Sequence, residues 1–186
     1  MDSTAWTIVI VVAAVVLLAL AVFWWMSMRR KNEEKRLQST FGREYDETYA
    51  RTGDQKQARQ ELKARADRVD SYQLRPLEND QRRRFIMEWE TMQASFVDDP
   101  ANAVSKADVL LADVMKARGY ETDSGDQAAR IEDVSVGHGD EAAAFREAAE
   151  ISRLNRDGRA TTEDLRRAIK DYAVVFDSLL NERQRA

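Results

Sequence analysis

The feature that most constrains the fold of this chain is an uncharged, strongly apolar run of 22 residues, Ala5–Met26. As a helix rising about 1.5 Å per residue, the run would span roughly 33 Å, enough to cross a hydrocarbon core about 30 Å thick. A single helix satisfies its own backbone hydrogen bonds in lipid and needs no partner segment for insertion. We therefore predict a transmembrane helix over residues 5–28, preceded by a short extracytoplasmic N-terminus, residues 1–4.

The residues that flank the apolar run predict how the helix is retained and oriented. Indole rings favour the headgroup region and basic residues resist translocation, so tryptophans should mark both interfaces and basic residues the cytoplasmic side. The predicted membrane-interface residues are Trp6, Trp24, Trp25, Arg29, Arg30 and Lys31. A cleaved signal peptide is disfavoured, because bulky residues rather than small ones close the run. We expect a single-pass protein of the cell (inner) membrane with residues 29–186 in the cytoplasm; insertion in the opposite sense would place them at the cell surface.

The composition of the remaining chain limits its chemistry. About 158 residues follow the predicted span, which suits one domain with a real core. The chain has no cysteine, which excludes disulfides, thiolate metal ligands and cysteine nucleophiles. Residues 29–84 hold 16 basic and 11 acidic residues, whereas residues 85–186 hold 13 basic and 21 acidic residues. The part next to the predicted span is therefore basic, which would suit anionic lipid; outside residues 29–36, solvated helix charge explains it equally well.

The chain after the span is predicted to be all-α, because no alternating strand pattern occurs and most glycines fall between helical segments. We expect a basic juxtamembrane helix over residues 29–40, continuous with the span and extending to about residue 52. A multi-helix bundle should follow over residues 41–181, with a C-terminal tail over residues 182–186.

Local signals predict where the helices begin. Asp54 and Asp99-Pro100 are start signals, and Thr161 with Asp164 forms a capping box. After the first helix, the predicted helices run over about 54–73, 79–98, 99–118, 127–134 and 140–156, and from 161 to at least 179. Glycine, serine and acidic residues dominate residues 120–139, which we expect to be the most mobile part of the domain.

Apolar side chains recur at spacings of three and four, which gives each helix one narrow apolar face. Helices of this kind must pack face to face in a bundle. The predicted core positions are Leu37, Phe41, Tyr45, Thr48, Ala58, Leu62, Ala66 (or Arg65), Val69, Tyr72, Phe85, Trp89, Met92, Phe96, Val104, Ala107, Leu111, Val114, Met115, Ala142, Phe145, Ala149, Ser152, Leu165, Ile169, Tyr172, Phe176 and Leu179. The spacing in the last helix would suit either the bundle core or a partner helix.

Few side chains after the span suggest chemistry. His138 is the only histidine, and a zinc site needs several histidine or cysteine ligands, so we expect a surface-loop residue and no metal site. Glu44 and Glu47 share a helix face, but nothing predicts their burial, so we interpret them as solvated charge rather than a catalytic pair. We interpret Arg82–Arg84 as exposed charge, since the chain lacks the net basic charge of nucleic-acid binders. No phosphate-binding glycine loop, nucleophile elbow or dinucleotide fingerprint occurs, so we predict no catalytic residue and no cofactor.

Six short motifs are spread over most of residues 41–180. They are Phe41-Gly42-x-Glu44-Tyr45-Asp46, Arg75-Pro76-Leu77, Trp89 with Gln93-x-x-Phe96-Val97-Asp98, Ala107-Asp108, Val114-Met115-x-x-Arg118-Gly119-Tyr120 and Thr162-Glu163-Asp164-Leu165-Arg166. In these motifs the chain resembles an uncharacterised family of bacterial single-pass membrane proteins. The resemblance implies a shared helical domain behind a membrane anchor and no particular activity. The chain departs from the family pattern around Ser135–Asp140, where glycines replace a His-Pro step, which weakens any role centred on His138.

The sequence supports two classes of function. The leading hypothesis is a membrane-anchored, non-enzymatic helical interaction or scaffold domain, because no chemistry-bearing motif is found. Its partners would be the lipid bilayer and other proteins, or the chain would self-associate; no nucleic acid is expected. The alternative is an enzyme or small-ligand binder whose site assembles from scattered helix residues such as Trp89, Arg75 and Glu44. A deep polar pocket would favour the alternative, whereas a filled bundle core would not.

Overall fold

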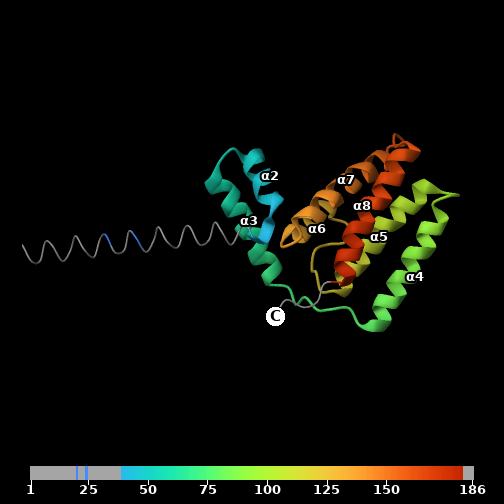
Figure 1. Ribbon diagram of the computed structural model, residues 1–186, viewed down its shortest axis with the longest axis horizontal. Helices are drawn as coiled ribbons and strands as arrows, with labels where there is room; N and C mark the ends of the chain where they lie inside the picture. Colours follow the sequence, from blue (N-terminus) through green and yellow to red (C-terminus); the bar gives the residue numbers. More distant parts are fainter. Residues whose placement is uncertain (1–19, 21–23, 25–38, 182–186) are drawn as a thin grey trace, which may run out of the picture.

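The computed structural model describes residues 20, 24 and 39–181, and in this part of the chain it is all-α (Figure 1). The helices are α2 (Arg43–Thr52), α3 (Gln55–Asp70), α4 (Asn79–Ser95), α5 (Pro100–Ala117), α6 (Gln127–Ser135), α7 (Gly139–Arg156) and α8 (Thr162–Asn181). No strand occurs among the described residues. The predicted fold class, an all-α helical bundle, is therefore confirmed.

Apart from Leu20 and Trp24, the predicted transmembrane helix lies outside the described residues. So do the predicted juxtamembrane helix up to residue 38 and the tail over residues 182–186. Within the described ranges, no helix combines the length and the apolarity that a membrane crossing requires. The anchor remains a prediction from the sequence.

Polar caps begin three helices where the sequence predicted them. The Asp54 carboxylate accepts a hydrogen bond from the backbone N–H two residues on, at 2.7 Å, and Asp99 accepts one from three residues on, at 3.1 Å. The backbone N–H of Thr161 donates to the Asp164 carboxylate at 3.0 Å, and the backbone N–H of Asp164 donates to the Thr161 hydroxyl at 3.2 Å. These caps satisfy first-turn donors that have no partner inside the helix, and they confirm the predicted start signals.

The first predicted helix is broken at Gly42. Residues 39–41 are helical, but Gly42 adopts φ 51° and ψ −124°, and α2 begins only at Arg43. A side chain disfavours this backbone conformation, so glycine at this position allows the chain to change direction. The expectation of one unbroken helix from the apolar run to about residue 52 is therefore wrong at this point.

The main hydrophobic core lies among α4, α5, α7 and α8. Helices α7 and α8 lie side by side, α5 packs against α8, and α4 runs along α5 at the edge of the bundle (Figure 1). The Trp89 ring of α4 stacks on Phe176 of α8, with centroids 4.5 Å apart and planes at 17°. All the predicted core residues of α5, α7 and α8 are buried, which confirms the apolar faces read from their spacing.

A second, smaller core attaches the α2–α3 hairpin to the rest of the molecule. It consists of Phe41, Tyr45, Leu62 and Val69 from the hairpin region, packed with Val136 from the end of α6. The hairpin contacts α7 through α2 and α6 through α3. It therefore covers one side of the α6–α7 pair, away from α4 (Figure 1).

Residues 120–139, expected to be the most mobile part, contain a well-packed helix. Ile131 and Val134 of α6 join the main core, and Asp133 is fully buried. A helix of nine residues shows too little periodicity to reveal a buried face, so its packing depends on distant neighbours that the sequence pattern does not show.

Gly139, the first residue of α7, allows the close approach between the hairpin and α7. A Cβ atom at this position would overlap the carbonyl oxygen of Phe41. Its φ is not in the left-handed region, so space rather than backbone conformation requires glycine here.

Replacing Gly139 with alanine should therefore destabilise the protein, although alanine is the better helix former. The added methyl group would push the hairpin away from α7, and overpacking of this kind costs about 1–3 kcal/mol. Thermal unfolding followed by circular dichroism would measure the loss. Gly125→Ala is the matched control, because a Cβ there meets only the flexible Asp123 side chain, at 3.5 Å. Equal melting temperatures for the two variants would contradict the close approach.

Candidate functional site

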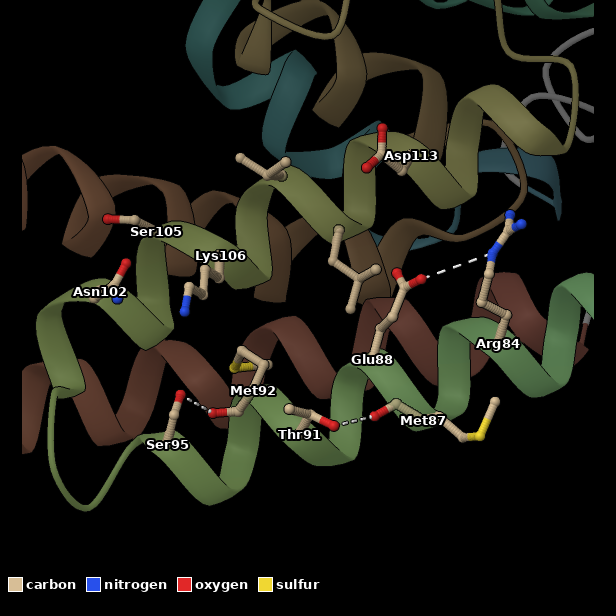
Figure 2. A pocket seen from close by; sticks show the side chains of 12 residues that line it. Arg84, Met87, Glu88, Thr91, Met92, Ser95, Asn102, Ser105, Lys106 and Asp113 are labelled. Carbon is tan, nitrogen blue, oxygen red and sulfur yellow. Dashed lines mark hydrogen bonds and ion pairs between the residues drawn. The ribbon is translucent and has the colours of Figure 1, made fainter.

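An open groove of about 660 Å³ runs along the outer face of the α4–α5 pair (Figure 2). Its walls extend from Arg84 to Ser95 on α4 and from Asn102 to Asp113 on α5. The two helices are antiparallel and joined by a short turn, so the first half of α4 lies beside the second half of α5. The groove lies at the edge of the bundle because no further helix among the described residues covers this face.

The middle of the groove is apolar and partly open to solvent. Met87 and Val109 retain 59% and 61% of their surface exposed, while Met92 and Leu110 are buried. Single exposed apolar side chains are ordinary on protein surfaces. Here two of them share one concavity with core residues, which is typical of an interaction surface.

The hydroxyl groups that line the groove need no outside partner. Thr91 and Ser95 donate hydrogen bonds to carbonyl groups of α4, at 2.8 and 2.7 Å, as Figure 2 shows. Ser105 donates to a carbonyl group of α5, at 3.1 Å. Because these hydroxyl groups already donate hydrogen bonds within their own helices, the side chains present mainly carbon atoms to a ligand. The groove therefore favours apolar contact.

Charged side chains lie on both sides of the apolar middle. Arg84 and Glu88 form an exposed ion pair, Nε to Oε1 3.7 Å, on the side that also carries Asp113 (Figure 2). Lys106 lies toward the other side. Within residues 39–181, neither Lys106 nor Asp113 has an ion-pair or side-chain hydrogen-bond partner. The groove thus carries a net negative charge at one end and a positive charge at the other.

The apolar face of the last helix does not form a binding surface. Tyr172, Phe176 and Leu179 of α8 are all within the main core, together with the rest of that face. The spacing in this helix suited either the bundle core or a partner helix, and the structure shows the face in the bundle core. The spacing of apolar residues did not predict the groove, because Met87 and Val109 lie off the core faces of their helices. Two such apolar residues on consecutive helices are the signal that could have indicated it.

A polar cluster inside the bundle was also missed. The Arg130 guanidinium donates to both oxygens of the Asp108 carboxylate, at 3.0 and 3.1 Å. Asp108 also accepts from Gln127 at 2.8 Å, and the Tyr172 and Ser152 hydroxyls are 2.8 Å apart. Burial, together with the nearby Asp108 carboxylate, raises the pKa of Tyr172 above its ordinary value. The phenol therefore stays neutral at ordinary pH, and the hydrogen bonds of the cluster link α5, α6, α7 and α8.

Glu44 is buried, which corrects its interpretation as solvated charge. Its side chain is 4% exposed and lies between two guanidinium groups, Arg65 Nη1 and Arg146 Nη2, each at 2.8 Å. Arg146 also binds Glu47 at 2.9 Å, and Glu47 remains 42% exposed as predicted. Arg65 and Arg146 are 21 and 102 residues away from Glu44 in the chain, so only the fold brings them together. The two glutamates therefore serve an ion-pair network between α2, α3 and α7.

His138 lies in a loop, as the sequence predicted, but it is less exposed than a surface residue. It immediately precedes α7, and its side chain is only 14% exposed. Its Nδ1 lies 3.2 Å from the hydroxyl of Ser178 on α8 and 3.9 Å from Glu141 Oε1. The distant helix α8 supplies the cover that local sequence could not show. In the part of the chain that the structure describes, no group of three or more metal-ligating side chains is found.

The three residues of the alternative hypothesis lie in three separate places. Trp89 is in the main core, Glu44 is in the hairpin ion pairs, and the Arg75 Nε donates to the Ala117 carbonyl at 3.2 Å. A second, polar hollow of about 710 Å³ adjoins Arg75, between residues 73–75 and 116–121. It contains neither Trp89 nor Glu44, so these three residues do not line one pocket.

The remaining predicted surface residues have mixed outcomes. Arg82–Arg84 are exposed, as predicted, and pair with Asn181, Asp80 and Glu88. Trp24 is 65% exposed. The other predicted membrane-interface residues, Trp6, Trp25, Arg29, Arg30 and Lys31, lie outside the described residues.

No family model, curated protein or solved structure matches this chain. The resemblance to bacterial single-pass membrane proteins therefore remains an expectation from sequence, and function has to be argued from the groove and from the apolar run.

Replacing Glu44 with glutamine should destabilise the protein. The change would remove the carboxylate that Arg65 and Arg146 share. Arg65 would keep its ion pair with Glu61, so we expect a loss of about 1–3 kcal/mol, less than for a buried charge left with no partner. Urea unfolding followed by circular dichroism would measure the free energy of unfolding. Glu47→Gln removes a carboxylate from the same Arg146 but at an exposed site, so it should cost less than about 1 kcal/mol. Similar losses for the two variants would contradict the structural role assigned to Glu44.

Proposed function

We propose that the protein is a membrane-anchored, non-enzymatic interaction domain that binds a helical segment in the α4–α5 groove. The observation that carries the proposal is the groove itself: exposed apolar side chains line it, and its hydroxyl groups are satisfied internally. A ligand with an apolar surface and few hydrogen-bonding groups would fit such a lining.

A helix is the ligand whose shape suits this groove. Two neighbouring helices leave a furrow between their ridges of side chains, and a third helix packs there as it would in a bundle. Amphipathic helices use this mode of recognition, with anchors at spacings of three and four. A small-molecule site would instead be a deeper pocket with convergent polar groups. The hydroxyl groups here are turned toward their own helices, which supports the helix over a small ligand.

The apolar run Ala5–Met26 and the basic residues after it support the anchor in this proposal. An anchor confines the domain to the membrane surface. A partner attached to the same membrane would then meet the groove at a raised effective concentration, without any additional contact. The family resemblance is consistent with this arrangement.

Site-specific photo-crosslinking would test the groove. A photoreactive amino acid at Val109 of the full chain, in its native membrane, should crosslink to a polypeptide, because Val109 lies in the bound interface. The matched control is Val174 on α8, which is 50% exposed but lies outside the groove. Equal crosslinking from the two positions, or none from Val109, would overturn the groove as the binding site.

Alkaline extraction of membranes would test the anchor. The full chain should stay in the membrane pellet, whereas Val15→Lys with Val16→Lys should release it. Each lysine at the centre of a membrane helix costs about 2.5–3.5 kcal/mol on the insertion scale. Val174→Lys, a charge added to an exposed position of α8, should leave the chain in the pellet. Extraction of the unmodified chain into the soluble fraction would refute the anchor.

A further inference from the structure

The charges that line the groove are the basis for choosing an occupant. We propose that the α4–α5 groove binds the same face of a second copy of this chain, in a two-fold symmetric, antiparallel pair. This inference rests on the proposed function, that the groove binds a helix, and it specifies which helix is bound: α5 of the second copy.

The exposed face of α5 carries one positive and one negative side chain, at equal distances from its apolar middle. Lys106 lies three residues before Val109, and Asp113 lies three residues after Leu110. Along the helix the two charges are about 10.5 Å apart. Lys106, Val109 and Asp113 are all exposed, at spacings of three and four, so they share one face of the helix. The midpoint between the charges therefore falls at the apolar centre of the groove.

A two-fold axis through that midpoint pairs unlike charges twice. In an antiparallel pair of α5 helices, Lys106 of each copy would face Asp113 of the other. Neither side chain has an ion-pair partner inside its own chain among the described residues, so both are available for this contact. Glu88 of α4 lies on the same side, but its charge is balanced by Arg84, so Asp113 supplies the net negative charge that the second copy's lysine would approach.

A helix that carries charges of only one sign does not match this pattern as well. A basic helix would meet Lys106 unfavourably, and an acidic helix would meet Asp113 unfavourably, because the groove carries both signs. In a second copy related by the two-fold axis, each lysine faces an aspartate, so the charges of the two copies are complementary. The same operation places Val109 of each copy over the apolar centre of the other, and so covers Val109 and Met87, two of the exposed apolar side chains of the described chain.

Single-cysteine crosslinking would locate the two-fold axis. The natural chain has no cysteine, so each variant carries one thiol. Disulfides require Cβ atoms about 3.5–4.5 Å apart, a distance that only residues near the axis reach with their own symmetry mate. Mild oxidation of the full chain in its membrane should convert Val109→Cys to a covalent dimer at least about tenfold faster than Val174→Cys. Equal rates at the two positions would overturn the proposal.

A charge exchange would test the register. Lys106→Glu alone and Asp113→Lys alone should each weaken dimerisation of the detergent-solubilised full chain, by about tenfold, because each places like charges together twice in the pair. The double variant Lys106→Glu with Asp113→Lys should restore dimerisation, since unlike charges face each other again. Sedimentation equilibrium measures all three, and unchanged circular dichroism spectra show that the exposed substitutions leave the fold intact. Failure of the double variant to restore the dimer would overturn the antiparallel register.

The two proposals fail in different ways. If the unmodified chain is monomeric while Val109 photo-crosslinks to a different polypeptide, the second copy is not the occupant and the groove is still a binding site. If Val109 forms neither a disulfide nor a photo-crosslink, the groove binds no helix and both proposals are wrong.

Discussion

The packing of α8 against α5 and α7 is the interaction on which the other surfaces depend. The apolar face of α8 is buried along its length, and Tyr172, Val175 and Phe176 are almost completely removed from water. Burying a large apolar side chain contributes roughly 1.5–3 kcal/mol, so this face supplies a large share of the driving force for folding. Stacking of Trp89 on Phe176 then attaches α4 to the same core. Because α4 adds the last layer on this side, its outer face and the neighbouring face of α5 remain uncovered.

Charged groups act together with a small apolar core to hold the α2–α3 hairpin in place. Glu44 joins Arg65 to Arg146, and the Arg68 guanidinium contacts Asp133 at 2.7 Å on the neighbouring helix α6. Buried ion pairs contribute little net stability, because desolvation opposes their attraction, but an unpaired member is strongly unfavourable. Such pairs therefore select one arrangement of the hairpin against others. The small apolar core around Phe41 supplies attraction, and the ion pairs supply the register.

The sequence predicted what depends on neighbours a few residues away. The caps at Asp54, Asp99 and Thr161 are local hydrogen bonds, and the buried faces of α5, α7 and α8 follow from spacings within one helix. What it missed depends on residues far apart in the chain. Glu44 and His138 differ from prediction because Arg146 and Ser178 cover them only in the folded molecule. The groove was missed for a related reason: whether Val109 is open or covered depends on where the other helices lie.

The position of the groove relative to the proposed anchor bears on the affinity that the proposed dimer would need. Along the longest axis of the molecule, the α2–α3 hairpin lies at one end of the described body and α4 at the other (Figure 1). The chain enters this body at residue 39, next to the hairpin, so the groove lies far from the side on which the proposed anchor would be attached. Two chains held in one membrane have already lost part of the freedom that association removes, which raises their effective concentration. Two exposed ion pairs contribute only about 0.2–1 kcal/mol each, and a modest apolar centre adds to them. Anchoring in one membrane would therefore strengthen a pairing that these contacts support only modestly, and the charge pattern would serve mainly to exclude other partners.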